Sequence, residues 1–168
     1  FFIALGMAMS TFAGQNLGAL EIDRIRKGFR TATLIAIIYS IIATAFAILF
    51  SQPLSYIFVD RNTVNPEVII EAVKYTITVS FFFIPLGFIF VYRTGCQGLG
   101  SGFIPMLSSI IELVLRCIGA YILPSIFSDS YLGICLSSPL AWIGAGFILP
   151  FIYLVYMKKI EKKVLLFD

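Results

Sequence analysis

The sequence predicts an all-α fold, a bundle of transmembrane helices, and its composition and hydropathy are the first reasons. Hydrophobic residues make up 60% of the 168 residues and charged residues only 12%, with a mean hydropathy of +0.99. A soluble domain carries about 25% charged residues, so this chain has too few to cover a globule in water. Uncharged runs at 31–50, 75–92 and 131–157 approach or exceed the ~20 residues that a helix needs to cross a bilayer.

Helices, rather than the strands of a barrel, are the predicted spans. Backbone polar groups inside lipid must bond to one another, so only helices and closed barrels cross a membrane. Barrel strands alternate polar and apolar residues, whereas residues 34–38 are all apolar. We therefore predict a single transmembrane domain over residues 1–168, a polytopic bundle with one partial and four complete spans. Their predicted ranges are about 1–20, 31–50, 66–92, 103–123 and 132–157.

The first two spans flank a basic loop at residues 21–30. Residue 1 lies within apolar sequence, without an initiator Met or the basic start of a signal peptide. We therefore expect the chain to be a fragment whose earlier spans are missing. After the second span, residues 52–64 are predicted to form a short surface segment, in which Leu54, Ile57 and Phe58 contact the membrane interface.

The third span is predicted to start at Asn65, a residue type that caps helix N-termini. Pro66 then falls in the first turn, and Glu67 lies near the positive end of the helix dipole. The fourth span follows the glycine-rich turn at 98–102. The fifth runs into a lysine-rich segment after residue 157.

Basic residues divide the predicted loops into two sides. Of the 12, Arg61 and Lys74 lie on one side and Arg116 lies within a span. The other nine share the opposite side: Arg24, Arg26, Lys27, Arg30, Arg93, Lys158, Lys159, Lys162 and Lys163. The positive-inside rule then predicts a multi-pass protein of the inner or plasma membrane, with loop 21–30 and the C-terminus cytoplasmic. Basic juxtamembrane loops are expected in such a protein, so we predict no nucleic-acid partner.

Cysteine and histidine usage excludes several kinds of chemistry. The chain has no histidine, and its three cysteines, Cys96, Cys117 and Cys135, are scattered without Cys-x-x-Cys spacing. Neither a disulfide framework nor a zinc site is predicted, and histidine-dependent catalysis is excluded for this segment. A nucleotide-binding glycine-rich loop is also lacking. We therefore expect no catalytic residue, metal site, cofactor or enzymatic activity.

Glu112 and Arg116 lie in the span 103–123, four residues apart with the acid first, the favourable order for a pair. We expect them to pair. Glu112 lies about 14 Å along the helix from residue 103, near mid-membrane, where an unpaired charge costs at least ~2.5–3.5 kcal/mol. Such charges usually face the bundle interior or a wet cavity and mark transport pathways. A transport role and a purely structural ion pair both remain open.

Three prolines lie inside predicted spans: Pro85 in the third, and Pro139 and Pro150 in the fifth. Each lacks a backbone N–H and frees the carbonyl four residues earlier, so we expect interrupted helices. Interrupted helices form binding sites and moving parts in transporters, but prolines also produce static kinks in membrane helices. Gating and static kinking therefore both remain open.

Small residues recur every four positions along the first span: Gly6, Ser10, Gly14 and Gly18. Such a stripe lets a neighbouring helix approach closely or slide, and close packing is the simpler explanation. Gln15 and Asn16 lie near the predicted cytoplasmic end of this span. Capping and interfacial hydration explain them, and a gating role is the alternative.

Aromatic residues at 81–83 follow a stretch rich in hydroxyl groups at 75–80. A cavity lined in this way suits flat lipophilic cations, whereas lipid-facing phenylalanine is the more common arrangement. Because three consecutive residues point in different directions around a helix, one or two of these rings at most can face inward.

Several stretches resemble the multidrug and toxic compound extrusion (MATE) family of transporters. Residues 6–19, GMAMSTFAGQNLGA, followed by a basic loop, are similar to the second helix of a lobe in that family. Residues 92–100, YRTGCQGLG, followed by Pro105 and Met106, resemble the junction between its tenth and eleventh helices. Residues 109–116 and 139–142 also fit the C-terminal lobe of its bacterial members.

This resemblance implies a parent of twelve helices in two pseudo-symmetric lobes, with this chain as the eighth through twelfth. Its partners would be membrane lipid and the missing N-terminal lobe of the same polypeptide. The implied activity is multidrug efflux, in which an inward gradient of Na⁺ or H⁺ drives export of small amphipathic or cationic solutes by alternating access. The motif residues to which it gives a possible gating role are Gln15, Asn16, Gly18, Arg93, Gln97 and Gly98.

One departure from the family concerns the coupling ion. Some members carry an acidic cation ligand in the tenth helix, roughly where this chain has Pro85 and Leu86. Glu112 is then the buried acid available here, and the missing lobe is the alternative place for coupling. Two other functions also remain open. One is a flippase for lipid-linked sugars, and the other is a non-transporting membrane scaffold or enzyme subunit.

Overall fold

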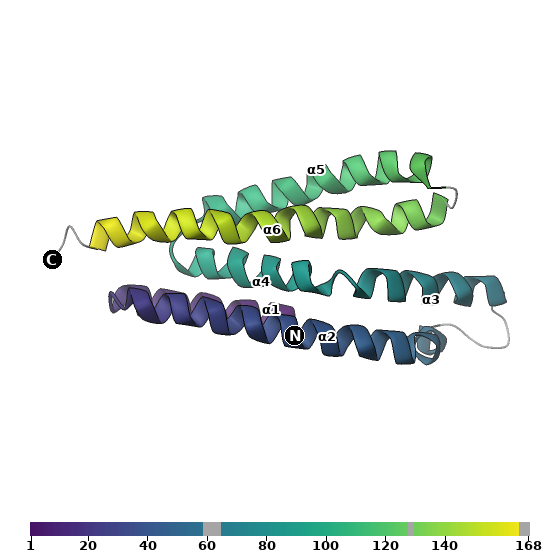
Figure 1. Cartoon of the computed structure of the whole chain (residues 1–168), viewed down its shortest axis with the longest axis horizontal. Helices are drawn as coiled ribbons and strands as arrows, with labels where there is room; N and C mark the ends of the chain where they lie inside the picture. Colours follow the sequence, from purple (N-terminus) through teal and green to yellow (C-terminus); the bar gives the residue numbers. More distant parts are fainter. Residues whose placement is uncertain (59–64, 128–129, 165–168) are drawn as a thin grey trace.

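The computed structural model describes residues 1–58, 65–127 and 130–164. These residues form six helices and no strand, and most of the helices run side by side along the long axis of the molecule (Figure 1). The helices are α1 (Phe2–Gly18), α2 (Ile22–Phe58), α3 (Pro66–Ser80), α4 (Phe83–Gly98), α5 (Phe103–Ile126) and α6 (Ser130–Val164). The predicted all-α class is confirmed.

Within the described residues, three helices are long and apolar enough to cross a membrane: α2, α5 and α6. The third predicted span consists of two helices, α3 and α4, which together form a fourth candidate with a bend of 54°. The first predicted span corresponds to α1, whose 17 residues fall a little short of the ~20 that a span usually has.

The second helix is longer than the predicted span 31–50. It begins at Ile22, so the basic residues at 22–30 form its first turns instead of a loop. Lysine and arginine are good helix formers, and Asp23 lies in the first turn, where the helix dipole favours an acid. The loop between α1 and α2 is correspondingly short, and Leu20 within it has a positive φ of 59°.

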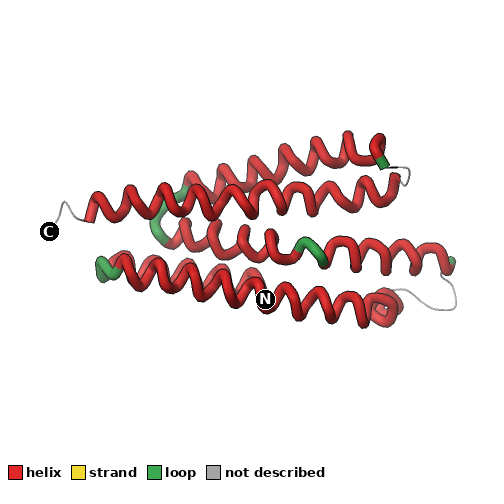
Figure 2. The backbone as a smooth tube through the Cα atoms, in the orientation of Figure 1, coloured by secondary structure: helices red, strands yellow, loops and turns green. Residues whose placement is uncertain are grey.

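The expected surface segment after this span is partly helical. Helix α2 continues through Pro53 to Phe58, and its last turns are seen nearly end-on in Figures 1 and 2, at an angle to the rest of the helix. A proline inside a helix removes one hydrogen bond and favours such a change of direction. The side chains of Ile57 and Phe58 are exposed there. Residues 59–64 of the predicted segment lie outside the described residues.

The last helix also differs from its prediction. Instead of ending near residue 157, α6 continues to Val164, and it runs without interruption through Pro139 and Pro150. The expected breaks at these two prolines are therefore wrong. Helices packed in a bundle tolerate single prolines, because neighbouring groups and small local adjustments compensate for the lost bond.

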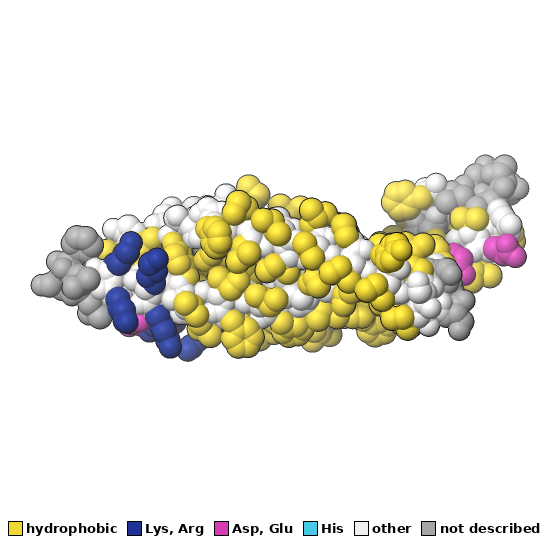
Figure 3. Space-filling model, turned by 90° about the horizontal axis from the view of Figure 1, so that it is seen from above, with side chains coloured by type: hydrophobic (Ala, Val, Ile, Leu, Met, Phe, Trp, Pro, Cys, Tyr) yellow, Lys and Arg dark blue, Asp and Glu magenta, His cyan; other side chains and the backbone are white. Residues whose placement is uncertain are grey.

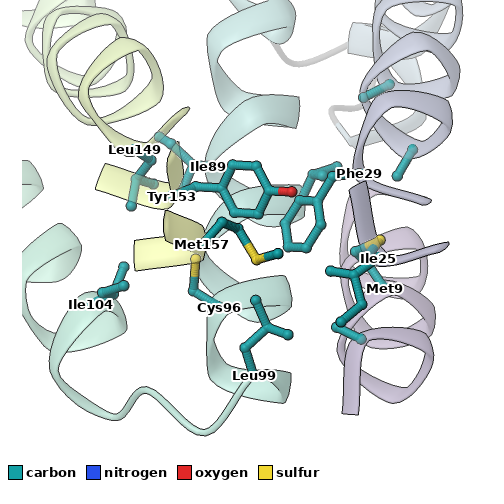
Figure 4. Close-up of a cluster of buried hydrophobic side chains, with 14 of the residues drawn as sticks. Met9, Ile25, Phe29, Ile89, Cys96, Leu99, Ile104, Leu149, Tyr153 and Met157 are labelled. Carbon is teal, nitrogen blue, oxygen red and sulfur yellow. The ribbon is translucent and has the colours of Figure 1, made fainter. Parts of the chain in front are cut away.

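Helix α4 is at the centre of the packing, in contact with α1, α2, α5 and α6. Figure 4 shows the buried cluster around its C-terminal half, where Phe29 of α2 faces Tyr153 of α6 with ring centroids 4.1 Å apart. Gly95 of α4 makes room for this ring, since a Cβ there would lie 2.5 Å from Phe29. Helices α2, α4 and α6 thus meet at a closely packed cluster, in which a glycine makes room for large apolar side chains.

The outer faces of the helices are largely apolar. Leu49 is 74% exposed and Val155 is 71% exposed, which is unfavourable in water but suits a lipid environment. In the view of Figure 3, hydrophobic side chains cover the middle of the molecule, and Lys and Arg side chains gather at one end. The molecule thus has a basic end, as the prediction that nine basic residues share one side requires.

Candidate functional site

The central feature of the candidate site is an ion pair between two spans. A guanidinium nitrogen of Arg93 in α4 lies 3.1 Å from a carboxylate oxygen of Glu112 in α5. The side chains are only 22% and 15% exposed, respectively. Because α4 and α5 are joined by a short turn at 99–102, they run antiparallel, and these two residues come level with each other part-way along the spans.

Polar and aromatic groups surround the pair. The hydroxyl of the buried residue Ser108 lies 3.4 Å from the same oxygen of Glu112, and that of Ser109 lies 3.4 Å from Arg93. The Arg93 guanidinium also lies 5.8 Å from the centre of the Phe90 ring, within cation–π range. Ser108 was not singled out from the sequence, although its position four residues before Glu112 places both on one helix face.

Arg116 does not form the expected pair with Glu112. Its side chain is exposed on α5, and Glu112 pairs with Arg93 of the neighbouring helix instead. The spacing of four residues makes a pair on one helix possible, but Glu112 faces Arg93 of α4, which also lies near Ser109 and the Phe90 ring. The predicted partner is therefore wrong, while the position of Glu112 inside the bundle agrees with the expectation.

The third predicted span is broken at residues 81–82, between α3 and α4, and Pro85 lies in the first turn of α4. The carbonyl of Ser80, at the end of α3, accepts a hydrogen bond from the Thr44 hydroxyl of α2 at 2.7 Å. A buried carbonyl without a partner is costly, so Thr44 stabilises the break. On the other side, Pro85 touches α6, because a Cβ at Gly146 would lie 2.5 Å from the Pro85 carbonyl oxygen.

The stripe of small residues in α1 packs against α4, as predicted. The closest approach is at Gly98, where a Cβ would lie 2.1 Å from the backbone oxygen of Ser10. Nearby, the Thr94 hydroxyl donates to the Gly6 carbonyl at 2.8 Å. Gly18 is different, because a Cβ there would meet nothing within 4 Å.

The remaining motif residues lie away from the ion pair. Gln15 and Asn16 line an open groove between α1 and α2, and the Asn16 amide donates to the Phe12 carbonyl at 2.8 Å. Gln97 is exposed near the end of α4. The structure thus joins Arg93 and Glu112 in one cluster and leaves the amides outside it.

Long apolar helices, a span broken part-way and a charge pair held between two spans define the class of this molecule. It is a multi-pass membrane protein. The family model MatE matches residues 1–122. The chain therefore belongs to the MatE family, the multidrug and toxic compound extrusion transporters.

The fold agrees with this membership. The chain is similar to a solved structure described as the inward-facing conformation of a multidrug resistance MATE family transporter of the MOP superfamily. The TM-score is 0.85 at 18% sequence identity, over 94% of this chain and 36% of that one. This chain therefore spans about a third of the length of that transporter. No curated protein matches the sequence.

Proposed function

We propose that this chain is the C-terminal-lobe part of a cation-coupled antiporter that exports amphipathic or cationic solutes by alternating access. The ion pair between Arg93 and Glu112 carries the proposal. A carboxylate held inside the membrane by a single arginine can exchange that partner for a bound cation. Na⁺ or H⁺ at Glu112 would neutralise the acid and release Arg93 from it.

This exchange would have a mechanical consequence, because the two partners lie on different helices. With the pair formed, the ion pair and the hydrogen bond from Arg93 to Ser109 connect α4 to α5, and Ser108 bonds to Glu112 within α5. With Glu112 neutralised, that tie is weaker, and the break at residues 81–82 lets α4 move relative to α3. A cation shifts a conformational equilibrium only if it binds one state more tightly. In this proposal, it binds more tightly to the state in which the Glu112 carboxylate is free of Arg93.

In the proposed orientation, the basic end of the bundle lies in the cytoplasm. The inward cation gradient that drives export is then the gradient across this same membrane. The rule that basic loops stay cytoplasmic supports it, since Lys and Arg side chains gather at that end. The N-terminal lobe of the same polypeptide would complete the solute cavity.

The test is gradient-driven transport of a fluorescent organic cation by vesicles that contain the full-length protein. Glu112→Gln keeps the shape of the side chain but not its charge, and we expect it to lower transport at least tenfold with normal protein abundance. Glu161→Gln is the matched control, because Glu161 pairs with Arg26 at 2.7 Å near the exposed end of the bundle. Normal coupled transport by Glu112→Gln would refute the proposed role.

A flippase for lipid-linked sugars is the second candidate, and Arg116 is the observation that favours it. An exposed arginine inside a span is costly when it faces lipid, so it is expected to face a polar partner, such as the phosphate of a lipid-linked sugar. The flippase is favoured if the unmutated protein translocates lipid-linked sugars but does not transport organic cations, and if Arg116→Gln abolishes that translocation. Absence of both activities would favour a non-transporting membrane subunit.

A further inference from the structure

We infer that the groove between α1 and α2 binds an anionic phospholipid, with its phosphate at Arg24 and Lys27 and an acyl chain along the groove. This site is separate from the Arg93–Glu112 pair and does not depend on the proposed antiport. It needs the helices to lie in a membrane and the groove to be open to lipid in the full-length protein.

The size of the groove suits one lipid chain. Its volume is about 840 Å³, within the range of ~300–1,000 Å³ that is usual for ligand sites. Along α2 the lining runs from Arg24 to Ile35, a rise of about 16 Å at ~1.5 Å per residue. That is about half of the ~30 Å hydrocarbon layer, the depth of one leaflet.

The walls of the deeper part are apolar. Leu5, Ala8 and Met9 come from α1, and Ala32 and Ile35 come from α2. The Phe12 ring lies against Gly28, since a Cβ at Gly28 would come within 2.2 Å of that ring. A glycine at this point therefore lets the Phe12 ring pack closely against α2, where the ring adds apolar surface to the groove.

The outer part of the groove is cationic and polar. Arg24 and Lys27 line it from the first turns of α2, and within the described part of the chain neither has an ion-pair or hydrogen-bond partner. Their neighbour Arg26 is different, because it turns to α6 and pairs with Glu161. The acids Glu21 and Asp23 are exposed and do not line the groove.

Two amides lie at the same level as these cations. The exposed Gln15 amide and Asn16 both line the groove, and Gln15 can donate to phosphate or ester oxygens, whereas Asn16 is bonded to the Phe12 carbonyl. Cations and amides at the interface above an apolar channel match the chemistry of an anionic lipid. An organic cation would be repelled by Arg24 and Lys27, and a zwitterionic lipid would gain less from them.

The test uses the full-length protein in phosphatidylcholine nanodiscs that contain either photoactivatable phosphatidylglycerol or the matched photoactivatable phosphatidylcholine. Mass spectrometry then locates the labelled residues. We expect phosphatidylglycerol to label the groove walls around Ala8 and Ile35. In competition with phosphatidylcholine, Arg24→Gln with Lys27→Gln should weaken phosphatidylglycerol labelling about 25-fold, since each basic residue near a membrane surface contributes a factor of about five.

Two further variants make the result decisive. Lys162→Gln with Lys163→Gln removes the same charge from exposed positions at the end of α6 and should leave groove labelling unchanged. Ala8→Trp fills the groove from an exposed position without changing charge, so it should abolish labelling even if the Arg24 and Lys27 variant does not fold. Any one of three results would overturn the inference. The two lipids could label the groove equally, the groove could stay unlabelled because another part of the protein covers it, or the lysine control could lose as much labelling as the Arg24 and Lys27 variant.

Discussion

At the scale of single residues, the pairing of Glu112 determines how the bundle holds a charge inside the membrane. Its carboxylate lies 3.1 Å from Arg93 on the neighbouring helix, and both side chains are mostly buried. Removing one partner of a buried pair leaves the other charged and unpaired, which is more costly than the pair is stabilising. Arg93 is thus a structural residue as well as the proposed exchange partner of the coupling ion.

We therefore expect Arg93→Gln to lower the free energy of unfolding by about 1–3 kcal/mol, less than the ~3–5 kcal/mol of a fully buried pair. Arg116→Gln should change it by under about 0.5 kcal/mol, because that side chain is exposed. Denaturant-induced unfolding in detergent measures both. A loss for Arg116→Gln as large as that for Arg93→Gln would contradict the observed pairing.

The sequence alone predicts a charged site at Glu112 but not its partner. The position of Glu112 along its helix determines its depth in the membrane. At that depth an unpaired charge is costly, so the sequence predicts that Glu112 has a partner. The choice between Arg116 and Arg93 depends on how α5 is rotated against α4, which a spacing of four residues on one helix cannot determine. Thr44 was also missed, because its role follows from the α2–α3 contact at the break.

At the scale of secondary-structure elements, the contact between α1 and α4 depends on glycine at the crossing. Gly98 and Gly18 are each the last residue of a helix, but their surroundings differ. A Cβ at Gly98 would lie 2.1 Å from the Ser10 backbone, whereas one at Gly18 would meet nothing within 4 Å. The two positions therefore form a matched pair for mutation.

Gly98→Ala should force α1 and α4 apart and destabilise the protein by about 1–3 kcal/mol, the usual cost of overpacking. Gly18→Ala should be close to neutral, within about 0.5 kcal/mol. Thermal unfolding in detergent, with the same preparation for both variants, makes the comparison. Equal stability of the two would show that the helices are not in close contact at Gly98.

The sequence predicts where spans exist better than where helices end. Uncharged runs indicate α2, the α3–α4 pair and α6. Pro85 indicates the region of the break between α3 and α4. The sequence does not predict the extra turns at the start of α2 and the end of α6, because basic residues beside a span suggest a loop although they are good helix formers. The breaks expected at Pro139 and Pro150 are wrong for a different reason, because a helix in a packed bundle can continue through single prolines.

At the scale of the whole molecule, the distribution of charge predicts how the protein lies in the membrane. The loop between α1 and α2 and the end of α6 lie near the basic end, whereas α5 ends at Ile126 and α6 begins at Ser130 at the opposite end (Figures 1 and 3). Epitope tags after Ala19 and after the C-terminus should therefore be reached from the cytoplasmic side only. A tag at Phe127 should be reached from outside intact cells, and access to all three from one side would contradict this topology.

The most direct test of the account is whether solute and cation compete through Glu112. Antiport requires that each ligand lower the affinity for the other, and this coupling is reciprocal at equilibrium. The affinity of the purified full-length protein for a fluorescent organic cation should therefore fall as Na⁺ or H⁺ concentration rises, and Glu112→Gln should abolish that dependence while Glu161→Gln retains it. A dependence on Na⁺ or H⁺ that is unchanged in Glu112→Gln would contradict the proposed coupling.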